Sequence, residues 1–313
     1  MSPGSLVGFG VLAVVLVTAF SLIATGWFAL TAERLRARGP AAERSAAAWA
    51  LLAPIVLAVT IVGVIAAIGS GSVDHCIGHH HHAHFCLVHG AAWLERPWAV
   101  ALAAASTITF VLRIAIVAWR RERARRAVAQ VRRVSDLGDR VRIARSDRVF
   151  CFVAGWRRPE VYMSSRAWDA LSDEERDAVF AHEQAHADSG DLWMSTVVEL
   201  ASTVAAPLAG SWLHMQWADA SERLCDAYAA RATAPATVAS ALVQMCRAGH
   251  LQALPGSFMP GAATLEHRVR AVLSGAPMGT RLGWRVWMLA GAAIVATTLL
   301  ASQLHHALET LLG

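Results

Sequence analysis

The stretch from Ala181 to His186 combines residue types and a spacing that suit metal chemistry. It reads His-Glu-x-x-His, with His182, Glu183 and His186 as its fixed positions. On a helix, side chains four positions apart share one face, so both imidazoles would point the same way. Two imidazoles on one face can bind one zinc ion, and the adjacent glutamate can take a proton from a zinc-bound water. The pattern therefore predicts a zinc site with Glu183 as the general base.

A catalytic zinc usually has three protein ligands and one open position, so a third ligand is expected downstream. The candidates are Glu199, His214, Glu222 and Asp226. Glu222 and Asp226 are four residues apart, which places both on one face of a helix. Glu222 could then bind the metal while Asp226 accepts a hydrogen bond from a ligand imidazole. The spacing alone leaves this choice open.

The residues before the motif predict the start of a helix. Ser172-Asp173-Glu174-Glu175 forms a capping box, with Ser172 at the N-cap and Glu175 at the third helical position. We expect this helix to continue to about Asp188 and Gly190 to end it. The metal motif therefore lies inside a helix with well-defined ends.

Short strands are expected upstream of this helix, at about 141–143, 149–153 and 160–164. Strands close to a metal-binding helix can offer an edge along which an extended peptide binds. Alternatively, they form a small hairpin that only packs against the helix.

The composition is that of a membrane protein, with 56% hydrophobic and 16% charged residues. Four apolar runs are long enough to span a bilayer, at about 6–30, 46–68, 98–119 and 284–304. The Arg-rich segments at 33–44 and after 119 indicate the cytoplasmic side, whereas the Arg-poor loop 69–97 indicates the outside. No known nucleic-acid-binding motif accompanies the arginines, so we expect no direct nucleic-acid partner.

A further apolar run, at 192–215, raises the question of another span. If it crossed the bilayer, His182 and Glu222 would lie on opposite sides and could not bind one zinc ion. We therefore expect a buried, interfacial or re-entrant helix, with Pro207 at a bend. Glu199 within it is expected to pair with a local partner and not with the metal.

The external loop is rich in histidine. Its seven histidines are His75, His79, His80, His81, His82, His84 and His89. Such tracts commonly bind metal ions, and Cys76 and Cys86 face an oxidising side where a disulfide can form. We hypothesise that the loop binds external metal ions and is coupled to the inner site; the alternative is an inert loop. Unchanged metal-dependent cleavage after deletion of 75–89 would refute the hypothesis.

Four segments together resemble a known family. They are Pro-Glu-Val-Tyr-Met-Ser at 159–164, Leu-Ser-Asp-Glu-Glu at 171–175, the motif at 182–186 with Asp191 after it, and Glu-Arg-Leu-Cys-Asp at 222–226. They are similar to the membrane zinc peptidases of family M56, the BlaR1/MecR1 type, which are related to the M48 Ste24/HtpX type. Cys225 favours M56, because the related type usually has alanine there. The resemblance covers about 159–273.

The resemblance implies a fold class and the roles of the site residues. The fold would be a mainly α integral membrane protein, with a gluzincin-like zinc peptidase domain (α plus a small β-sheet) between the third and fourth transmembrane helices. We expect three spans in 1–122, a cytoplasmic peptidase domain in 123–282, and the fourth span with a short external tail in 283–313. Glu222 would be the third ligand of Zn²⁺, Glu183 the general base and Asp226 the partner of a ligand imidazole. Because the sequence stops just after the last span, no penicillin-binding sensor domain is expected.

The function implied is a zinc metalloendopeptidase of the bacterial plasma membrane, cleaving proteins at the cytoplasmic face. The substrate would be a transcriptional repressor of the BlaI type, in a signalling role. One alternative is an HtpX-like protease for membrane-protein quality control, and another is a non-catalytic metal sensor that uses the external loop. The donor to the transition-state oxyanion is left open among Tyr228, His214, His267, Arg223 and Arg268.

Overall fold

The computed structural model describes residues 3–71, 96–138, 140–155, 157–249, 262–275 and 277–280, and the single residues 292 and 296. The histidines and cysteines of the external loop lie outside this part of the chain. So does the expected fourth span, apart from the two single residues. The proposed external metal loop, the Cys76–Cys86 disulfide and the fourth span therefore stay predictions.

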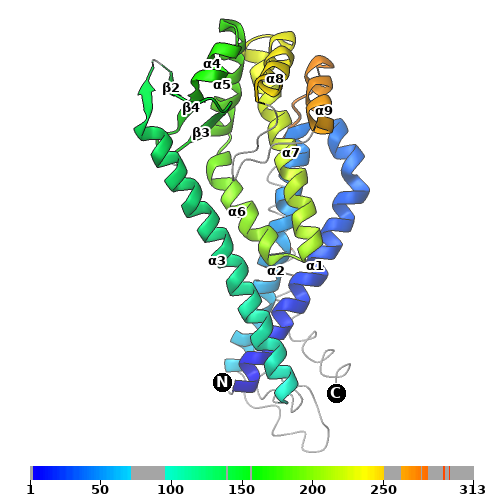
Figure 1. The fold of residues 1–313 in the computed structure, drawn as a ribbon. Coiled ribbons are helices and arrows are strands. Elements are labelled where there is room, and N and C mark those ends of the chain that lie inside the picture. The colour runs from blue at the N-terminus through cyan, green and yellow to red at the C-terminus, as the bar shows by residue number, and fades with distance from the viewer. Residues whose placement is uncertain are drawn as a thin grey trace, which may run out of the picture.

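Three long helices of the described residues are candidate membrane spans: α1 (Pro3–Arg38), α2 (Pro40–Gly71) and α3 (Pro97–Arg133). Each is long and apolar enough to cross a bilayer. All three extend past the predicted span ends, because alanine and arginine are good helix formers and continue the helix beyond the apolar run. The segments 33–44 and 120–133, expected as connections, are therefore largely helical. In Figure 1, α3 crosses the α1–α2 pair near one end and diverges from it towards the other.

A sharp elbow, residues 38–41, joins α1 to α2. Gly39 adopts φ +105°, a conformation that favours glycine. Segment 277–280 lies against the elbow, where the backbone N–H of Ala41 donates to the carbonyl oxygen of Met278 at 3.1 Å. A Cβ atom at position 39 would collide with the backbone of Pro277 and Gly279. The elbow is therefore fixed by contacts from a distant part of the sequence.

A small four-stranded sheet follows α3. Its strands are β1 (Ser135–Leu137), β2 (Val141–Ala144), β3 (Cys151–Ala154) and β4 (Glu160–Ser164), in the order β1-β2-β4-β3. β2 and β4 are parallel, and the other two pairs are antiparallel. The three predicted strands are confirmed as β2, β3 and β4. β1 was not predicted, because three residues, one of them Asp136, give no apolar alternation.

The helices around the metal motif are α4 (Ser165–Ala170), α5 (Asp173–Asp188), α8 (Pro235–Gly249) and α9 (Ala262–Leu273). They gather with the sheet at one end of the molecule (Figure 1).

The capping box of α5 is confirmed. The Ser172 hydroxyl accepts a hydrogen bond from the Glu175 N–H at 3.3 Å, and the Glu175 carboxylate accepts one from the Ser172 N–H at 2.9 Å. Gly190, at φ +73°, follows the end of the helix. These contacts set both ends of the helix that carries the metal motif.

The apolar run 192–215 folds into two antiparallel helices, α6 (Asp191–Val204) and the start of α7 (Pro207–Ala232). The chain turns back at Ala205 and Ala206, with Pro207 in the first turn of α7. Neither helix is among the candidate spans found in the described residues. The second half of α7 thereby returns to the side of α5.

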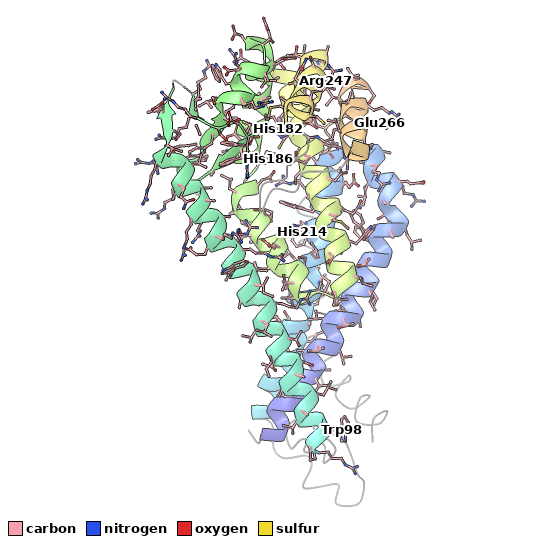
Figure 2. All side chains as sticks on the ribbon, viewed as in Figure 1. Trp98, His182, His186, His214, Arg247 and Glu266 are labelled. Atoms are coloured by element: carbon pink, nitrogen blue, oxygen red, sulfur yellow. The ribbon has the colours of Figure 1, made fainter. Side chains whose placement is uncertain are left out.

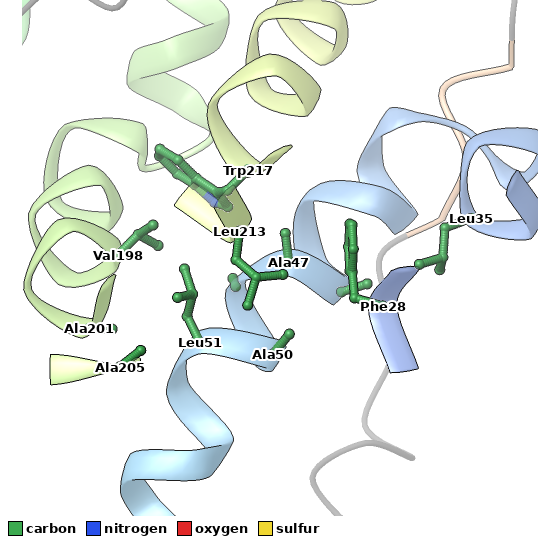
Figure 3. Close-up of a cluster of buried hydrophobic side chains, with 12 residues drawn as sticks. Phe28, Leu35, Ala47, Ala50, Leu51, Val198, Ala201, Ala205, Leu213 and Trp217 are labelled. Carbon is green, nitrogen blue, oxygen red and sulfur yellow. The ribbon is translucent and has the colours of Figure 1, made fainter. Parts of the chain in front are cut away.

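The helical hairpin packs against α1 and α2 through a buried apolar cluster (Figure 3). The cluster includes Phe28, Leu35, Ala47, Ala50, Leu51, Val198, Ala201, Ala205, Leu213 and Trp217. The residues of α2 in this cluster belong to its apolar run, so the hairpin lies beside the spans. Leu208, near the tip, is 88% exposed.

Candidate metal centre

Three side chains from two helices converge on one point. His182 and His186 lie one turn apart on α5, with their Nε2 atoms 3.2 Å from each other. Glu222 approaches from α7, with one oxygen 3.6 Å from Nε2 of His182 and the other 3.5 Å from Nε2 of His186. In Figure 2 both histidines lie towards the end of the molecule opposite Trp98. The turn between α6 and α7 is what returns Glu222 to the histidines.

The spacing of these atoms fits a zinc ion. In tetrahedral coordination at 2.0–2.1 Å, ligand atoms stand about 3.3–3.4 Å from one another. The Nε2 atoms of His182 and His186 are 3.2 Å apart, close to this value, and each lies 3.5 or 3.6 Å from a different oxygen of the Glu222 carboxylate. Two imidazoles and one carboxylate also leave one position for water, as a catalytic site requires.

Each imidazole is oriented by a carboxylate on its other nitrogen. Nδ1 of His182 lies 2.9 Å from Asp226, and Nδ1 of His186 lies 2.8 Å from Asp191. A proton held on Nδ1 leaves the Nε2 lone pair free for a metal. The contact between Asp226 and His182 is the one expected if Asp226 orients a ligand imidazole. Asp191 was part of the resemblance only, and its role follows from the structure.

Arg268 on α9 forms ion pairs with two acidic residues of the site, Asp226 and Glu222. Its Nε and Nη2 atoms each donate to Asp226 at 2.7 Å, and Nη1 lies 2.9 Å from Glu222. The side chain of Arg268 is buried. From the sequence, Arg268 was a candidate oxyanion donor only, whereas in the structure it holds the carboxylates of Glu222 and Asp226 in place.

The electrostatics follow from these contacts. Burial alone would lower the pKa of His182, but the hydrogen bonds to Asp226 and Glu222 outweigh it and raise this pKa to about 10. Burial would raise the pKa values of both carboxyls, but Arg268 reverses this, lowering that of Glu222 and bringing that of Asp226 to about 2. Both acids are therefore ionised at neutral pH, and a metal ion that binds here must displace imidazole protons.

Glu183 lies within electrostatic reach of the ligands and of the neighbouring strand. Its negative charge acts on His186 of α5. Burial raises the pKa of the Cys151 thiol on β3, and the charge of Glu183 adds to this rise. The helix that carries Glu183 packs against this strand, because Val179 and Phe180 of α5 lie in the same apolar cluster as Cys151.

The other candidate ligands lie elsewhere. Glu199 forms an ion pair of 2.6 Å with Arg121 of α3, so this acid has a local partner within the helices. His214 packs near Trp217. In Figure 2 it lies away from His182, on the part of α7 that belongs to the hairpin. Neither Glu199 nor His214 joins the cluster.

A second set of potential ligands shares one histidine with the first. His186, Asp191 and Cys225 also have ligand atoms within 4.8 Å of one another. Asp191, however, already contacts His186 through one oxygen and Arg44 through the other. A cation there would meet the positive charge of Arg44, so we assign the metal to His182, His186 and Glu222.

Comparison with known proteins gives one match. The model of peptidase family M48 matches residues 117–259, which include the His-Glu-x-x-His motif and Glu222. No curated protein and no solved structure matches the chain. The match supports a metallopeptidase of the M48 type, and the described residues of the chain include three helices long and apolar enough to cross a membrane. The resemblance to family M56 is not confirmed.

Proposed function

We propose that the chain is a zinc-dependent membrane endopeptidase. The observation that carries the proposal is that the Nε2 atoms of His182 and His186 lie 3.2 Å apart and each lies 3.5 or 3.6 Å from a carboxylate oxygen of Glu222. The Nδ1 atom of each imidazole contacts a further carboxylate. The match to peptidase family M48 supports the same activity. A zinc ion bound here would polarise the scissile carbonyl and lower the pKa of its bound water.

Glu183 is the proposed general base. It neighbours His182 on α5, and its carboxylate is neither a proposed ligand nor an orienting group. It would take a proton from the attacking water and pass it to the leaving amine.

The free edge of β3 is the proposed binding site for the substrate backbone. Within the described sheet, β3 is an edge strand that pairs with β4, and no other described strand pairs with its second edge. An extended peptide added to this edge would follow the pattern of β-strand addition. Because α5 packs against β3 through Val179, Phe180 and Cys151, a peptide on this edge would lie beside the helix that carries the general base.

The distribution of arginines supports cleavage at the cytoplasmic face of a bacterial plasma membrane. Two substrate classes remain as proposals: a repressor of the BlaI type in signalling, and misfolded membrane proteins in an HtpX-like quality-control role. The match to family M48 is equally consistent with the second. Co-expression with a winged-helix repressor and, separately, with a misfolded membrane protein would show which of them is cleaved.

The substitution Glu183→Gln tests the activity. In lipid nanodiscs, the variant should cleave an unfolded protein about 10²–10⁴-fold more slowly, because it loses the general base. Its bound zinc should equal that of the wild type, because the proposed ligands are unchanged. Glu199→Gln is the matched control, since Glu199 pairs with Arg121 away from the site, and it should retain cleavage. Undiminished cleavage by the Glu183 variant would refute the proposal.

A further inference from the structure

We infer that Arg44, at the start of α2, is a positioning residue of the metal site, so that a membrane helix completes the site. The inference rests on the proposed function. It concerns a residue 138 positions before His182, outside the part of the chain that matches the peptidase family.

A chain of three side chains links α2 to the metal ligands. Nη2 of Arg44 forms an ion pair with Oδ1 of Asp191, and Oδ2 of Asp191 lies 2.8 Å from Nδ1 of His186. The side chains of Arg44 and Asp191 are each only 9% exposed. Without Arg44, the buried carboxylate would lose its counter-charge and one of the two contacts that fix its orientation. The orientation of the His186 ring would then be less well defined.

Other contacts hold Arg44 in place. Its guanidinium lies 5.6 Å from the ring centre of Trp217 on α7, and Nη2 lies 3.5 Å from the carbonyl oxygen of Ser189. Arg44 thus contacts α7 and the junction between α5 and α6 as well as Asp191. Its position depends on α2 docking correctly against the helical hairpin.

Glu43, the residue before Arg44, makes a second ion pair, in which α2 supplies the negative charge. Glu43, which is fully buried, accepts a hydrogen bond of 2.7 Å from Arg223, the residue after the ligand Glu222. Arg36 of α1 also donates to Glu43, at 3.3 Å. Arg44 of α2 therefore pairs with Asp191 on α6, and Glu43 of α2 pairs with Arg223 on α7, the helix that carries Glu222. Displacement of α2 would leave both buried pairs broken, which fixes its position against α6 and α7.

The segment that matches the peptidase family, 117–259, therefore does not contain all the residues that orient the metal ligands. If α2 is absent or displaced, the contact from Arg44 to Asp191 is lost. The effect of Arg44 on the metal runs through Asp191 and His186, so it should be visible in metal binding itself, without any measurement of cleavage.

The experiment uses the full chain in nanodiscs, with the histidines and cysteines of 75–89 replaced by serine so that the loop cannot bind metal. Zinc affinity is measured by competition with a chelator, and Co²⁺ serves as a probe through its visible absorption. Arg44→Met should bind zinc about tenfold more weakly, the lower end of the effect of losing an outer partner. Its cobalt spectrum should differ from that of the wild type. Arg44→Lys, which keeps the charge, should recover part of the affinity.

Arg121→Met is the matched control. It removes an arginine that pairs with an acid on the same helix, α6, but away from the metal site. Its zinc affinity and cobalt spectrum should equal those of the wild type. Circular dichroism establishes whether each variant is folded. If Arg44→Met does not fold, Arg44→Lys decides the question, because it should still bind zinc measurably more weakly than the wild type.

Wild-type zinc affinity and an unchanged cobalt spectrum in a folded Arg44 variant would overturn the inference while leaving the proposed function intact. A wild-type chain that bound no cobalt, or a Glu222→Gln variant that bound it equally well, would instead overturn the proposed function, and the inference with it.

Discussion

Arg268 and Asp226 form a buried two-point ion pair, with both hydrogen bonds at 2.7 Å. The third nitrogen of the same guanidinium lies 2.9 Å from Glu222. One arginine from α9 therefore pairs with both of the acids that α7 presents to the metal site. This relationship explains how the buried carboxylate of Asp226 and the partly buried carboxylate of Glu222 remain ionised.

Substitution Arg268→Met should weaken zinc binding about 10–100-fold, because Glu222 and Asp226 both lose the group that orients them. Chelator competition would measure the change. Arg270→Met is a matched control on the same helix, since Arg270 is exposed and pairs with Glu266 at the surface. Equal zinc affinities for the two variants would contradict the role assigned to Arg268.

Zinc affinity should depend on pH over an unusually wide range. Because the pKa of His182 is raised to about 10, its imidazole is protonated throughout the neutral range, and zinc must displace this proton. Apparent affinity should therefore rise about tenfold or more per pH unit from pH 6 to pH 8, whereas an ordinary imidazole would level off near pH 7. Chelator competition at several pH values measures this dependence.

The control for the pH dependence is Asp226→Asn, which removes the hydrogen-bonding partner that most raises the pKa of His182. Its affinity curve should level off at lower pH than that of the wild type. Wild-type affinity that stops rising above pH 7 would contradict the assigned electrostatics.

Substitution Gly39→Ala should destabilise the protein by at least about 1–2 kcal/mol. Position 39 has a positive φ, and an added Cβ would meet the backbone of Pro277 and Gly279. Thermal unfolding in detergent would measure the loss. Gly63→Ala, where an added Cβ meets nothing within 4 Å, should not destabilise. Equal stability of the two variants would show that the elbow does not depend on this contact.

Much of the peptidase part could be predicted from local patterns. The capping box at Ser172 and Glu175, the strand Glu160–Ser164 and the helix around Arg268 each have a signal within a few residues. That the chain does not cross the bilayer between His182 and Glu222 was predicted by a different argument, because one metal ion cannot have ligands on both sides of a bilayer.

The supports of the site could not be predicted in the same way. The arginines near 36–44 indicated membrane topology, and nothing in their spacing distinguishes Arg44, which is buried against Asp191, from its exposed neighbour Arg38. Such pairs depend on how α2 packs against the helical hairpin. That packing is a property of the tertiary structure and has no local pattern in the sequence.

X-ray absorption at the zinc edge tests the central assignment most directly. The sample would be the zinc-loaded full chain, with the histidines and cysteines of 75–89 replaced by serine. If His182, His186 and Glu222 bind the metal, the spectrum should show only nitrogen and oxygen neighbours at about 2.0–2.2 Å, two of them imidazoles. A sulfur neighbour at about 2.3 Å would contradict the account, because it would place the metal at the alternative set that includes Cys225.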